Sequence, residues 1–395
     1  MESTLAEHRY TVDRAQLIRR LRAVLPATAL LAEEEEMRPY DCDGLTAIRQ
    51  LPLLVALPES EEQAQAILRI CHELRAPVVT RGAATGLSGG ATPHPDGVLV
   101  SLAKLKKIIA VDPLSRTAVV QPGVRNLAVS EAAAPHGLYY APDPSSQIAC
   151  TIGGNVAENA GGVHCLKYGL TVHNVLRVRG LTIAGDIVEF GNAALDAPGY
   201  DLLALLNGSE GLLAMITEVT VRLTPKPELA QVVIASFDDV RKAGDAVASI
   251  IAAGIIPAGL EMMDRKATHA VEPYVNAGYD LQAEAILLCE SDGTPEEVAE
   301  EIGRMQAVIE RSGAAGIRVS QSEAERLRFW AGRKAAFPAV GRLTPDYLCM
   351  DGTIPRRRLA EMLEAINALS EKYGLRCANV FHAGDGNLHP LIMYD

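Results

Sequence analysis

The first half of the chain alternates short apolar runs with segments in which apolar residues recur every three to four positions. The recurring pattern is typical of amphipathic helices, and short apolar runs between turn residues are typical of buried strands. The alternation continues to about Leu223 and predicts alternating strands and helices. Its first elements are a helix at 13–25 that Asp13 and Gln16 can cap, a strand at 53–56, a helix at 60–74 with Ser60 as its N-cap, and a strand at 77–80.

Two prolines in the sequence Leu223-Thr-Pro-Lys-Pro227 mark a domain boundary. Beyond it, strands and long amphipathic helices alternate, and this order predicts a separate α+β domain with an antiparallel sheet. The expected division is an N-terminal helical segment at 1–50, a glycine-rich domain at 51–226 and an α+β domain at 227–395. The last of these is expected to contain strands at 231–236 and 284–289 and helices at 240–253, 295–312 and 323–337.

Composition and charge exclude several classes of protein. The 395 residues are 48% hydrophobic and 22% charged, which is ordinary for a globular protein. A formal net charge of −12 argues against general binding to nucleic acid. The longest uncharged apolar stretch, 246–260, contains a proline and is too short for a transmembrane segment, and the acidic N-terminus predicts no secretory signal. Seven scattered cysteines without a CxxC pair predict free thiols in the reducing cytoplasm.

The loop Arg81-Gly-Ala-Ala-Thr-Gly-Leu-Ser-Gly-Gly90 is the first candidate ligand-binding motif. Its glycines let the backbone approach a ligand closely, and successive N–H groups can form a nest for phosphate. The spacing matches neither GxGxxG nor a Walker A loop, and an apolar run at 98–101 follows where a Rossmann fold would begin a helix. The loop therefore predicts phosphate binding of another kind, with a purely structural glycine turn as the alternative.

A second stretch of small and polar residues runs from Thr151 to Gly162, shortly after the sequence Pro142-Asp-Pro-Ser-Ser146. It has almost no core-forming side chains, so we expect it to lie beneath a flat ligand rather than pack against other elements. Thr151 can cap a helix whose N-terminus faces a pyrophosphate. The sequence Gly208-Ser-Glu-Gly211, which precedes an apolar run at 216–223, is a weaker third motif.

The sequence Asn379-Val-Phe-His-Ala-Gly-Asp-Gly-Asn-Leu-His-Pro390 predicts a β-hairpin. Asp385-Gly386 is a strong two-residue turn signal, and a turn there would set His382 directly opposite His389. Directly opposed residues have Cβ atoms roughly 4.5–5.5 Å apart, which suits two imidazoles on one metal ion. A cross-strand histidine pair without a metal is the alternative. Catalytic zinc usually has three protein ligands, so two histidines do not complete a site.

These motifs together resemble the FAD-binding domain of the vanillyl-alcohol oxidase and p-cresol methylhydroxylase flavoproteins. With the sequences at 330–342 and 345–357 added, the chain is similar to the branch that contains bacterial glycolate oxidase FAD subunits and D-lactate and D-2-hydroxyglutarate dehydrogenases. The resemblance covers nearly the whole chain. It implies an α+β protein with a two-subdomain FAD-binding domain of the p-cresol methylhydroxylase type, followed by a cap or substrate domain.

The resemblance also implies a function and site residues. The implied reaction is FAD-dependent oxidation of a short (R)-2-hydroxy acid, glycolate or D-lactate. Arg333 would hold the substrate carboxylate, with a surface ion pair to Glu325 as the alternative, and His382 and His389 would bind a divalent metal (Zn, Mn or Fe). The residues implied to bind FAD are Arg81, Gly82, Ala83, Ala84, Thr85, Gly86, Leu87, Ser88, Gly89, Pro142, Asp143, Ser146, Thr151, Gly153, Gly154, Asn155, Asn159, Gly161, Gly162, Glu210, Gly211 and Ile216.

The family's partners follow from the same resemblance. Electrons would leave to an accessory flavin subunit and an iron–sulfur subunit, which places the chain in the cytoplasm or at the inner membrane through these partners. Covalent attachment of FAD through His164 or Cys165, a feature of some members of the wider superfamily, is not expected.

Two departures from the family pattern are visible. Ala84 stands where the family loop usually has glycine, and if this position has a positive φ the alanine costs on the order of 1 kcal/mol and weakens FAD retention. The family normally continues beyond the hairpin with a Glu-His-Gly-Ile-Gly motif that supplies a third metal ligand and the general base. The sequence ends without it, which predicts a truncated chain. A catalytically incomplete FAD-binding module is therefore the alternative function.

Overall fold

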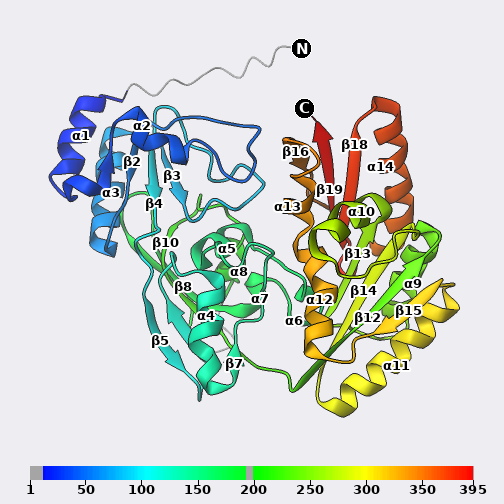
Figure 1. The fold of residues 1–395 in the computed structure, drawn as a ribbon. Coiled ribbons are helices and arrows are strands. Elements are labelled where there is room, and N and C mark those ends of the chain that lie inside the picture. Colours follow the sequence, from blue (N-terminus) through cyan, green and yellow to red (C-terminus); the bar gives the residue numbers. More distant parts are fainter. Residues whose placement is uncertain (1–11, 193–198, 395) are drawn as a thin grey trace. The chain divides into compact units, whose positions relative to one another are not determined.

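The chain divides into two compact units (Figure 1). The computed structural model describes residues 12–192 and 199–394. The first unit comprises the chain through Ala160 and again Leu170–Pro225, and the second comprises Gly161–Gly169 and the chain from Lys226 onward. The joint at Pro225 lies one residue from the boundary expected from the sequence. The expected division did not anticipate that residues 161–169 leave the first unit and fold with the second.

The first unit begins with helices whose N-cap residues were predicted correctly from the sequence. The side chain of Asp13 accepts a hydrogen bond from the backbone N–H of Gln16 at 3.0 Å, and that of Ser60 accepts one from Gln63 at 3.3 Å. The helices of this unit are α1 (Arg14–Arg22), α2 (Glu34–Met37), α3 (Glu61–Leu74), α4 (Asn126–Ala133), α5 (Ile152–Glu158), α7 (Thr171–Asn174) and α8 (Leu202–Leu206), with 3₁₀ turns at Ala27–Ala29, Arg38–Tyr40 and Ala134–His136.

Two sheets organise the first unit. Its strands are β1 (Leu30–Leu31), β2 (Leu54–Ala56), β3 (Val78–Arg81), β4 (Val98–Ser101), β5 (Ile108–Asp112), β6 (Thr117–Val120), β7 (Leu138–Tyr139), β8 (Val175–Leu181), β9 (Ile187–Gly191), β10 (Met215–Arg222) and β11 (Thr224–Pro225). The first sheet has the order β1-β2-β4-β3, with β2, β4 and β3 parallel. The second has the order β5-β6-β10-β8-β9 and is antiparallel.

Each sheet of the first unit has its own apolar core. Leucines and isoleucines of α1 and α3 pack on the first sheet, and α4 and α5 pack on the second. The loop that carries the glycines begins directly after β3. The short strands β7 and β11 pair with each other and bring the chain to the Pro225 joint.

The second unit is built on one antiparallel sheet, and helices connect many of its strands along the chain. Its helices are α6 (Cys165–Tyr168), α9 (Val240–Ala252), α10 (Arg265–Val275), α11 (Pro295–Arg311), α12 (Glu323–Lys334), α13 (Ala336–Val340) and α14 (Leu359–Tyr373), with a 3₁₀ turn at Arg356–Arg358. Its strands are β12 (Leu229–Phe237), β13 (Gly259–Asp264), β14 (Ala285–Gly293), β15 (Gly316–Val319), β16 (Asp346–Cys349), β17 (Gly352–Thr353), β18 (Arg376–His382) and β19 (Asn387–Tyr394). The order is β15-β12-β14-β13-β18-β19-β16, and β17 also pairs with β19.

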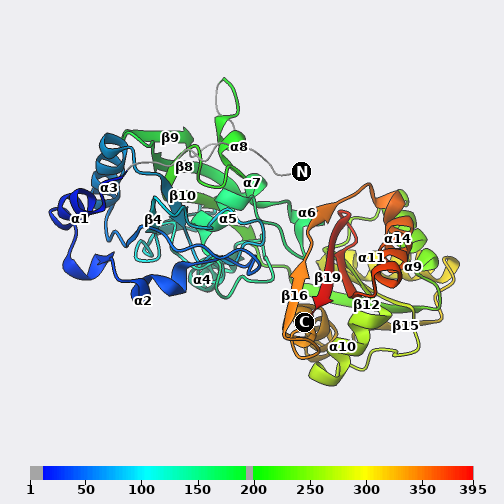
Figure 2. The ribbon, with the colours of Figure 1, turned by 90° about the horizontal axis from the view of Figure 1, so that it is seen from above.

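The two faces of this sheet differ in chemistry. Helices α9, α11 and α14 cover one face (Figures 1 and 2), where alternate residues of β12, β13 and β14 form an apolar core. The intervening residues point to the opposite face, because successive side chains of a strand alternate. That face carries the buried polar residues Glu261, Glu290, Asp292, His382 and His389.

Most expected elements are confirmed in type, with changes at their ends. The helix expected at 323–337 is two helices, since α12 ends at Lys334 and α13 begins at Ala336. The strand expected at 284–289 runs on to Gly293 as β14. All seven cysteines are free, as predicted. Within residues 12–192 and 199–394, no helix has the length and apolar character needed to cross a membrane.

Candidate active site

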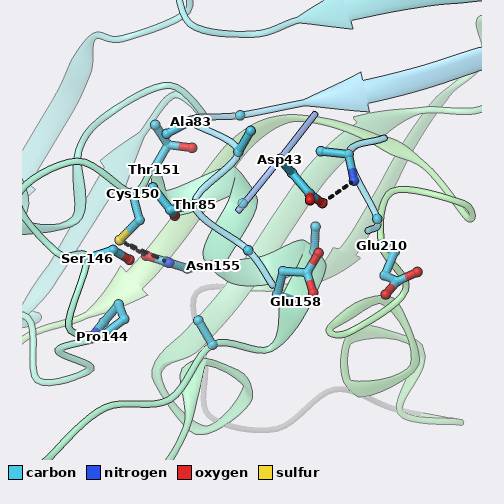
Figure 3. A pocket seen from close by; sticks show the side chains of 18 of the residues that line it. Asp43, Ala83, Thr85, Pro144, Ser146, Cys150, Thr151, Asn155, Glu158 and Glu210 are labelled. Carbon is cyan, nitrogen blue, oxygen red and sulfur yellow. Dashed lines mark hydrogen bonds between the residues drawn. The ribbon is translucent and has the colours of Figure 1, made fainter. Parts of the chain in front are cut away.

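A pocket in the first unit lies where the glycine-containing motifs meet (Figure 3). One wall is the loop that follows β3, and the other is the first part of α5 with the residues just before it. The pocket is lined by Asp43, Thr80, Gly82, Ala83, Ala84, Thr85, Gly86, Gly90, Ala91, Pro144, Ser146, Cys150, Thr151, Gly154, Asn155, Ala157, Glu158, Ala160 and Glu210. An adjoining hollow shares several of these residues and adds Leu102, Pro122, Gly153, Gly211, Ala214 and Ile216.

Two of the glycines are required because there is no room for a side chain at their positions. A Cβ on Gly82 would stand 2.5 Å from Thr151 Oγ1, and one on Gly153 would stand 2.5 Å from the Cβ of Pro122. Both distances are far inside van der Waals contact, so a larger residue would push the walls apart. Ala84 has the positive φ that would make an alanine unfavourable, since its φ is 54°. This alanine therefore occupies the left-handed region, which disfavours a Cβ.

One buried polar atom in the pocket has no hydrogen-bond partner in the described part of the chain. It is Thr151 Oγ1, at the N-cap of α5, where its side chain makes no cap hydrogen bond. A buried hydroxyl left unpaired costs roughly 1–3 kcal/mol, so this atom favours a ligand group beside it. The small side chains around it and the unpaired hydroxyl fit a phosphate-containing group such as FAD.

The two ends of the pocket differ in charge (Figure 3). Ser146, Cys150 and Asn155 gather at one end, and the carboxylates of Asp43, Glu158 and Glu210 lie at the other. Burial raises the pKa of Glu158, and repulsion from Glu210 and Asp43 raises it further. This asymmetry favours anionic ligand groups at the neutral end and hydrogen-bond donors at the acidic end.

Most of the sequence-predicted FAD residues line the pocket or its adjoining hollow, and some do not. Arg81 points away, since its guanidinium donates to the backbone carbonyls of Tyr40 at 3.3 Å and Cys42 at 2.6 Å. Asn159 ends α5 and accepts a hydrogen bond from the N–H of Val172 at 2.9 Å. Gly161 and Gly162 belong to the second unit. Leu87, Ser88, Gly89, Pro142 and Asp143 are also absent from the lining of the two cavities.

The sequence predicted Glu210 at the acidic end of the pocket but missed the other two carboxylates, Asp43 and Glu158. Glu158 lies inside the motif that was singled out, and its position on α5 next to the glycines could have indicated it. Asp43 precedes the glycine loop by about forty residues and gives no local signal. Its carboxylate accepts hydrogen bonds from the N–H groups of Leu45 at 2.9 Å and Ala91 at 3.4 Å, which tie the two loops together.

The histidine hairpin exists, but its predicted register is wrong. His382 pairs with Asn387, and Val380 pairs with His389. The turn therefore spans four residues, 383–386, rather than the two residues Asp385-Gly386. Within this turn, the N–H of Gly384 donates to the carbonyl of Leu260 on β13 at 2.9 Å. The shift is by two positions, so both histidines remain on one face, as diagonal neighbours with ring centroids 4.9 Å apart.

Arg333, on α12, lies beside this histidine pair and is 1% exposed. Its Nε donates to Glu261 Oε2 at 2.7 Å, and its Nη2 lies 3.4 Å from His382 Nδ1. The other oxygen of Glu261 is 2.7 Å from His382 Nδ1. The surface ion pair considered as an alternative is absent here, since Glu325 pairs with Arg328 instead. Sequence reasoning missed Glu261, although an acidic residue amid the apolar residues of β13 was a usable signal.

His389 is neutral in this environment. Burial, the neighbouring His382 and the charge of Arg333 lower the pKa of His389 to about 2. Its Nδ1 is buried without a hydrogen bond in the described part of the chain, and a carboxylate oxygen of Asp351 lies 3.5 Å away. Two adjacent imidazoles of this kind suit a metal ion as ligands. No group of three or more His, Cys, Asp or Glu that could hold a metal occurs among the described residues.

A second buried carboxylate, Glu290, holds the segment 161–169 on the second unit. Its oxygens contact His164 Nε2 at 3.0 Å and Arg326 Nη1 at 2.8 Å, and Trp330 donates its indole N–H to it. Burial alone would raise the pKa of Glu290, but the hydrogen bond and charge of His164, the charge of Arg326 and the hydrogen bond from Trp330 lower it to about 2. The thiol of Cys165 is buried and accepts a hydrogen bond from the N–H of Gly162 at 2.8 Å.

Family models match both parts of the chain. Residues 52–191 match the "FAD binding domain" model, and residues 226–395 match "FAD linked oxidases, C-terminal domain". Solved structures with a similar fold include p-cresol methylhydroxylase, with a TM-score of 0.80 at 17% identity over 96% of this chain and 83% of that one. Alkyldihydroxyacetonephosphate synthase is also similar, with a TM-score of 0.79 at 18% identity over 96% of this chain and 80% of that one.

Relatives in sequence carry more specific names. Glycolate oxidase subunit GlcD of Escherichia coli K12 is 61% identical over 97% of this chain and 77% of its own length. GlcD of Bacillus subtilis is 38% identical over 90% and 76%. D-lactate dehydrogenase of Anaerostipes hadrus is 32% identical over 98% and 82%. The chain therefore belongs to the family of FAD-linked oxidoreductases that contains glycolate oxidase subunit GlcD and D-lactate dehydrogenase, and FAD is its cofactor.

Proposed function

We propose that this chain oxidises a small 2-hydroxy acid, glycolate or D-lactate, to the corresponding 2-oxo acid. The observation that carries the proposal is the buried cluster in which Arg333 lies within 3.4 Å of His382, whose ring stands against His389. This buried cluster combines a guanidinium, two imidazoles and a carboxylate. Such a set of groups suits a small anion that carries a carboxylate and a neighbouring hydroxyl. The names of the relatives support the choice of glycolate or D-lactate.

The geometry supports the following proposed roles for the chain's own residues. Arg333 binds and orients the substrate carboxylate, since a guanidinium forks onto a carboxylate. His382 and His389 contribute two of the ligands of a divalent cation (Zn, Mn or Fe), whose charge would lower the pKa of the substrate hydroxyl. In the first unit, the proposed FAD contacts are the pocket residues around Gly82 and Thr151. When bound, FAD supplies the redox chemistry by accepting the two electrons and α-hydrogen of the hydroxy acid.

Partners and location form a further part of the proposal. The relatives from Escherichia coli and Bacillus subtilis are named as subunits of glycolate oxidase, which supports assembly with other chains. We propose an accessory flavin subunit and an iron–sulfur subunit as electron acceptors. The location would then be cytoplasmic, with attachment to the inner membrane through these partners. Affinity purification of the chain from its own cells, followed by iron and flavin analysis of the complex, tests this part.

The test of the reaction is anaerobic reduction of the flavin in the purified, FAD-loaded chain. We expect glycolate or D-lactate to bleach the visible flavin bands, and L-lactate to do so much more slowly. Arg333→Met should lose bleaching while keeping FAD, because Arg333 lies in the second unit and the pocket in the first. Arg328→Met, which removes an exposed arginine of the same helix, serves as the control. Flavin bands that persist with both acids would favour the alternative, an FAD-binding module without turnover.

A further inference from the structure

The carboxylate of Glu261 is placed between two groups of the proposed site. It lies in the middle of β13, is 1% exposed, and uses one oxygen for each neighbour. Strands β13 and β18 pair through Met262 and Phe381, so the same register places Glu261 opposite His382. The contact thus arises from the sheet itself, and rigid elements hold it.

We propose that Glu261 is a positioning residue: it sets the tautomer of His382, leaving Nε2 unprotonated for a metal ion, and it orients Arg333 toward the substrate. This inference rests on the proposed function, since it assigns roles within the same site.

The proton on His382 follows from hydrogen-bond chemistry. A carboxylate only accepts hydrogen bonds, so a ring nitrogen 2.7 Å from Glu261 Oε1 carries the proton. That nitrogen is Nδ1, and in a neutral imidazole the other nitrogen then keeps its lone pair. The guanidinium Nη2 at 3.4 Å is a neighbour of Nδ1 rather than its donor, because both atoms carry hydrogens. Carboxylates commonly hold metal-binding histidines in this way.

The same carboxylate selects which edge of Arg333 is offered to the substrate. Glu261 Oε2 takes the N–H of Nε at 2.7 Å. A guanidinium presents two edges for bidentate contact, one with Nε and one with the two terminal nitrogens. With Nε engaged, the terminal edge is left for the substrate carboxylate. Loss of Glu261 would free the guanidinium to rotate and to present either edge.

Glu261 also balances charge around the histidines. Arg333 alone would place a buried cation beside His382 and repel a metal ion. Further carboxylates face this place: Asp385 in the hairpin turn and Asp351 next to β16 both interact with His382. The ion pair with Glu261 neutralises the charge of the Arg333 guanidinium next to the His382 ring. Glu261 therefore interacts with Arg333 and His382 at the same time.

The decisive variant is Glu261→Gln, which keeps the shape but has one acceptor for two donors. The amide oxygen should go to the charged Arg333, so the amide NH₂ faces His382 Nδ1 and forces the proton onto Nε2. Nitrogen-15 NMR of histidine-labelled protein reads the tautomer directly, with His382→Asn to assign the signals. Isothermal titration with Zn²⁺ or Mn²⁺ should show about 10- to 100-fold weaker binding.

Glu290→Gln is the matched control. Glu290 is also buried on this face of the sheet and also contacts a histidine and an arginine. It should lose comparable stability while leaving the His382 tautomer and the metal affinity unchanged. Glu261→Asp keeps the charge but cannot reach both partners, so it should fold and weaken metal binding. It also decides the matter if the glutamine variant does not fold.

The outcomes separate this inference from the proposed function. An unchanged His382 tautomer together with unchanged metal affinity in both Glu261 variants would overturn the positioning role. Wild-type protein that binds neither Zn²⁺ nor Mn²⁺, or whose flavin no hydroxy acid reduces, would count against the proposed function. The tautomer measurement in the metal-free protein would still decide the role of Glu261.

Discussion

Gly82 and Thr151 lie so close together that a Cβ on the glycine would stand 2.5 Å from the threonine hydroxyl oxygen. The two residues belong to different loops, one after β3 and one before α5, and their contact brings the two walls of the pocket together. The same hydroxyl has no partner in the described part of the chain. A small change at this contact therefore alters the shape of the pocket.

Gly82→Ala should abolish or strongly weaken FAD binding, because the new methyl group displaces Thr151 from the pocket wall. We expect at least tenfold weaker binding in a titration of the apoprotein followed by flavin fluorescence. Gly303→Ala is the control: Gly303 lies within α11, where an added Cβ meets nothing within 4 Å. That variant should bind FAD normally and gain up to about 1 kcal/mol of stability from helix propensity. Normal FAD binding by the Gly82 variant would contradict the placement of the site.

Ala84→Gly should stabilise the protein and its FAD complex. Ala84 has a φ of 54°, where glycine is favoured by about 1 kcal/mol or slightly more. The greater freedom of glycine in the unfolded chain offsets part of this gain. The net effect should be a few tenths to about 1 kcal/mol in urea unfolding, with slower FAD loss on dilution. The neighbouring Ala83→Gly, at a position without a positive φ, should instead destabilise, and equal effects at the two positions would argue against strain at Ala84.

Acidification should destabilise the metal-free protein through His389. Its pKa is about 2 when folded, against an ordinary value of 6.5, so below pH 6.5 the unfolded chain binds a proton that the folded chain does not. The stability is complete above pH 6.5 and falls as the pH drops, by up to about 1.4 kcal/mol per pH unit. Glu290 adds to the loss below its ordinary value of 4.5, so the wild type and a variant without the histidine are compared between pH 6.5 and 5. Urea unfolding of His389→Phe should show a shallower slope there, and an identical slope would exclude His389 as the source.

Asp292→Asn should loosen the segment 161–169. One oxygen of Asp292 accepts from Lys167, and the other accepts from the hydroxyl of Tyr168 at 2.8 Å. Loss of the charge should weaken this attachment by about 1–2 kcal/mol, with allowance for partial solvent exposure. Hydrogen exchange should accelerate in residues 161–169 and little elsewhere in the second unit. The exposed Asp280→Asn serves as the control, and equal protection of the segment in both variants would contradict this account.

Local patterns in the sequence were sufficient to predict most of the expected helices and strands and many of the residues that line the pocket. The caps of α1 and α3 depend on residues three positions apart, so Asp13 and Ser60 could be identified without knowledge of the fold. The hairpin register failed because a distant contact, from Gly384 to the carbonyl of Leu260, engages the turn. The contact between Glu261 and His382 could not be predicted for the same reason. Glu261 meets His382 only because β13 lies next to β18, over a hundred residues later in the chain, and nothing local specifies that pairing.

The segment 161–169 also limits how this protein could be cut and recombined. The chain passes from the first unit to the second after Ala160, returns before Leu170, and crosses again at Pro225. A gene exchange with a single crossover at Pro225 would join a foreign sheet to a segment whose His164 and Lys167 need Glu290 and Asp292 as partners. Working chimaeras of two such relatives therefore require residues 161–169 to be inherited together with the C-terminal unit.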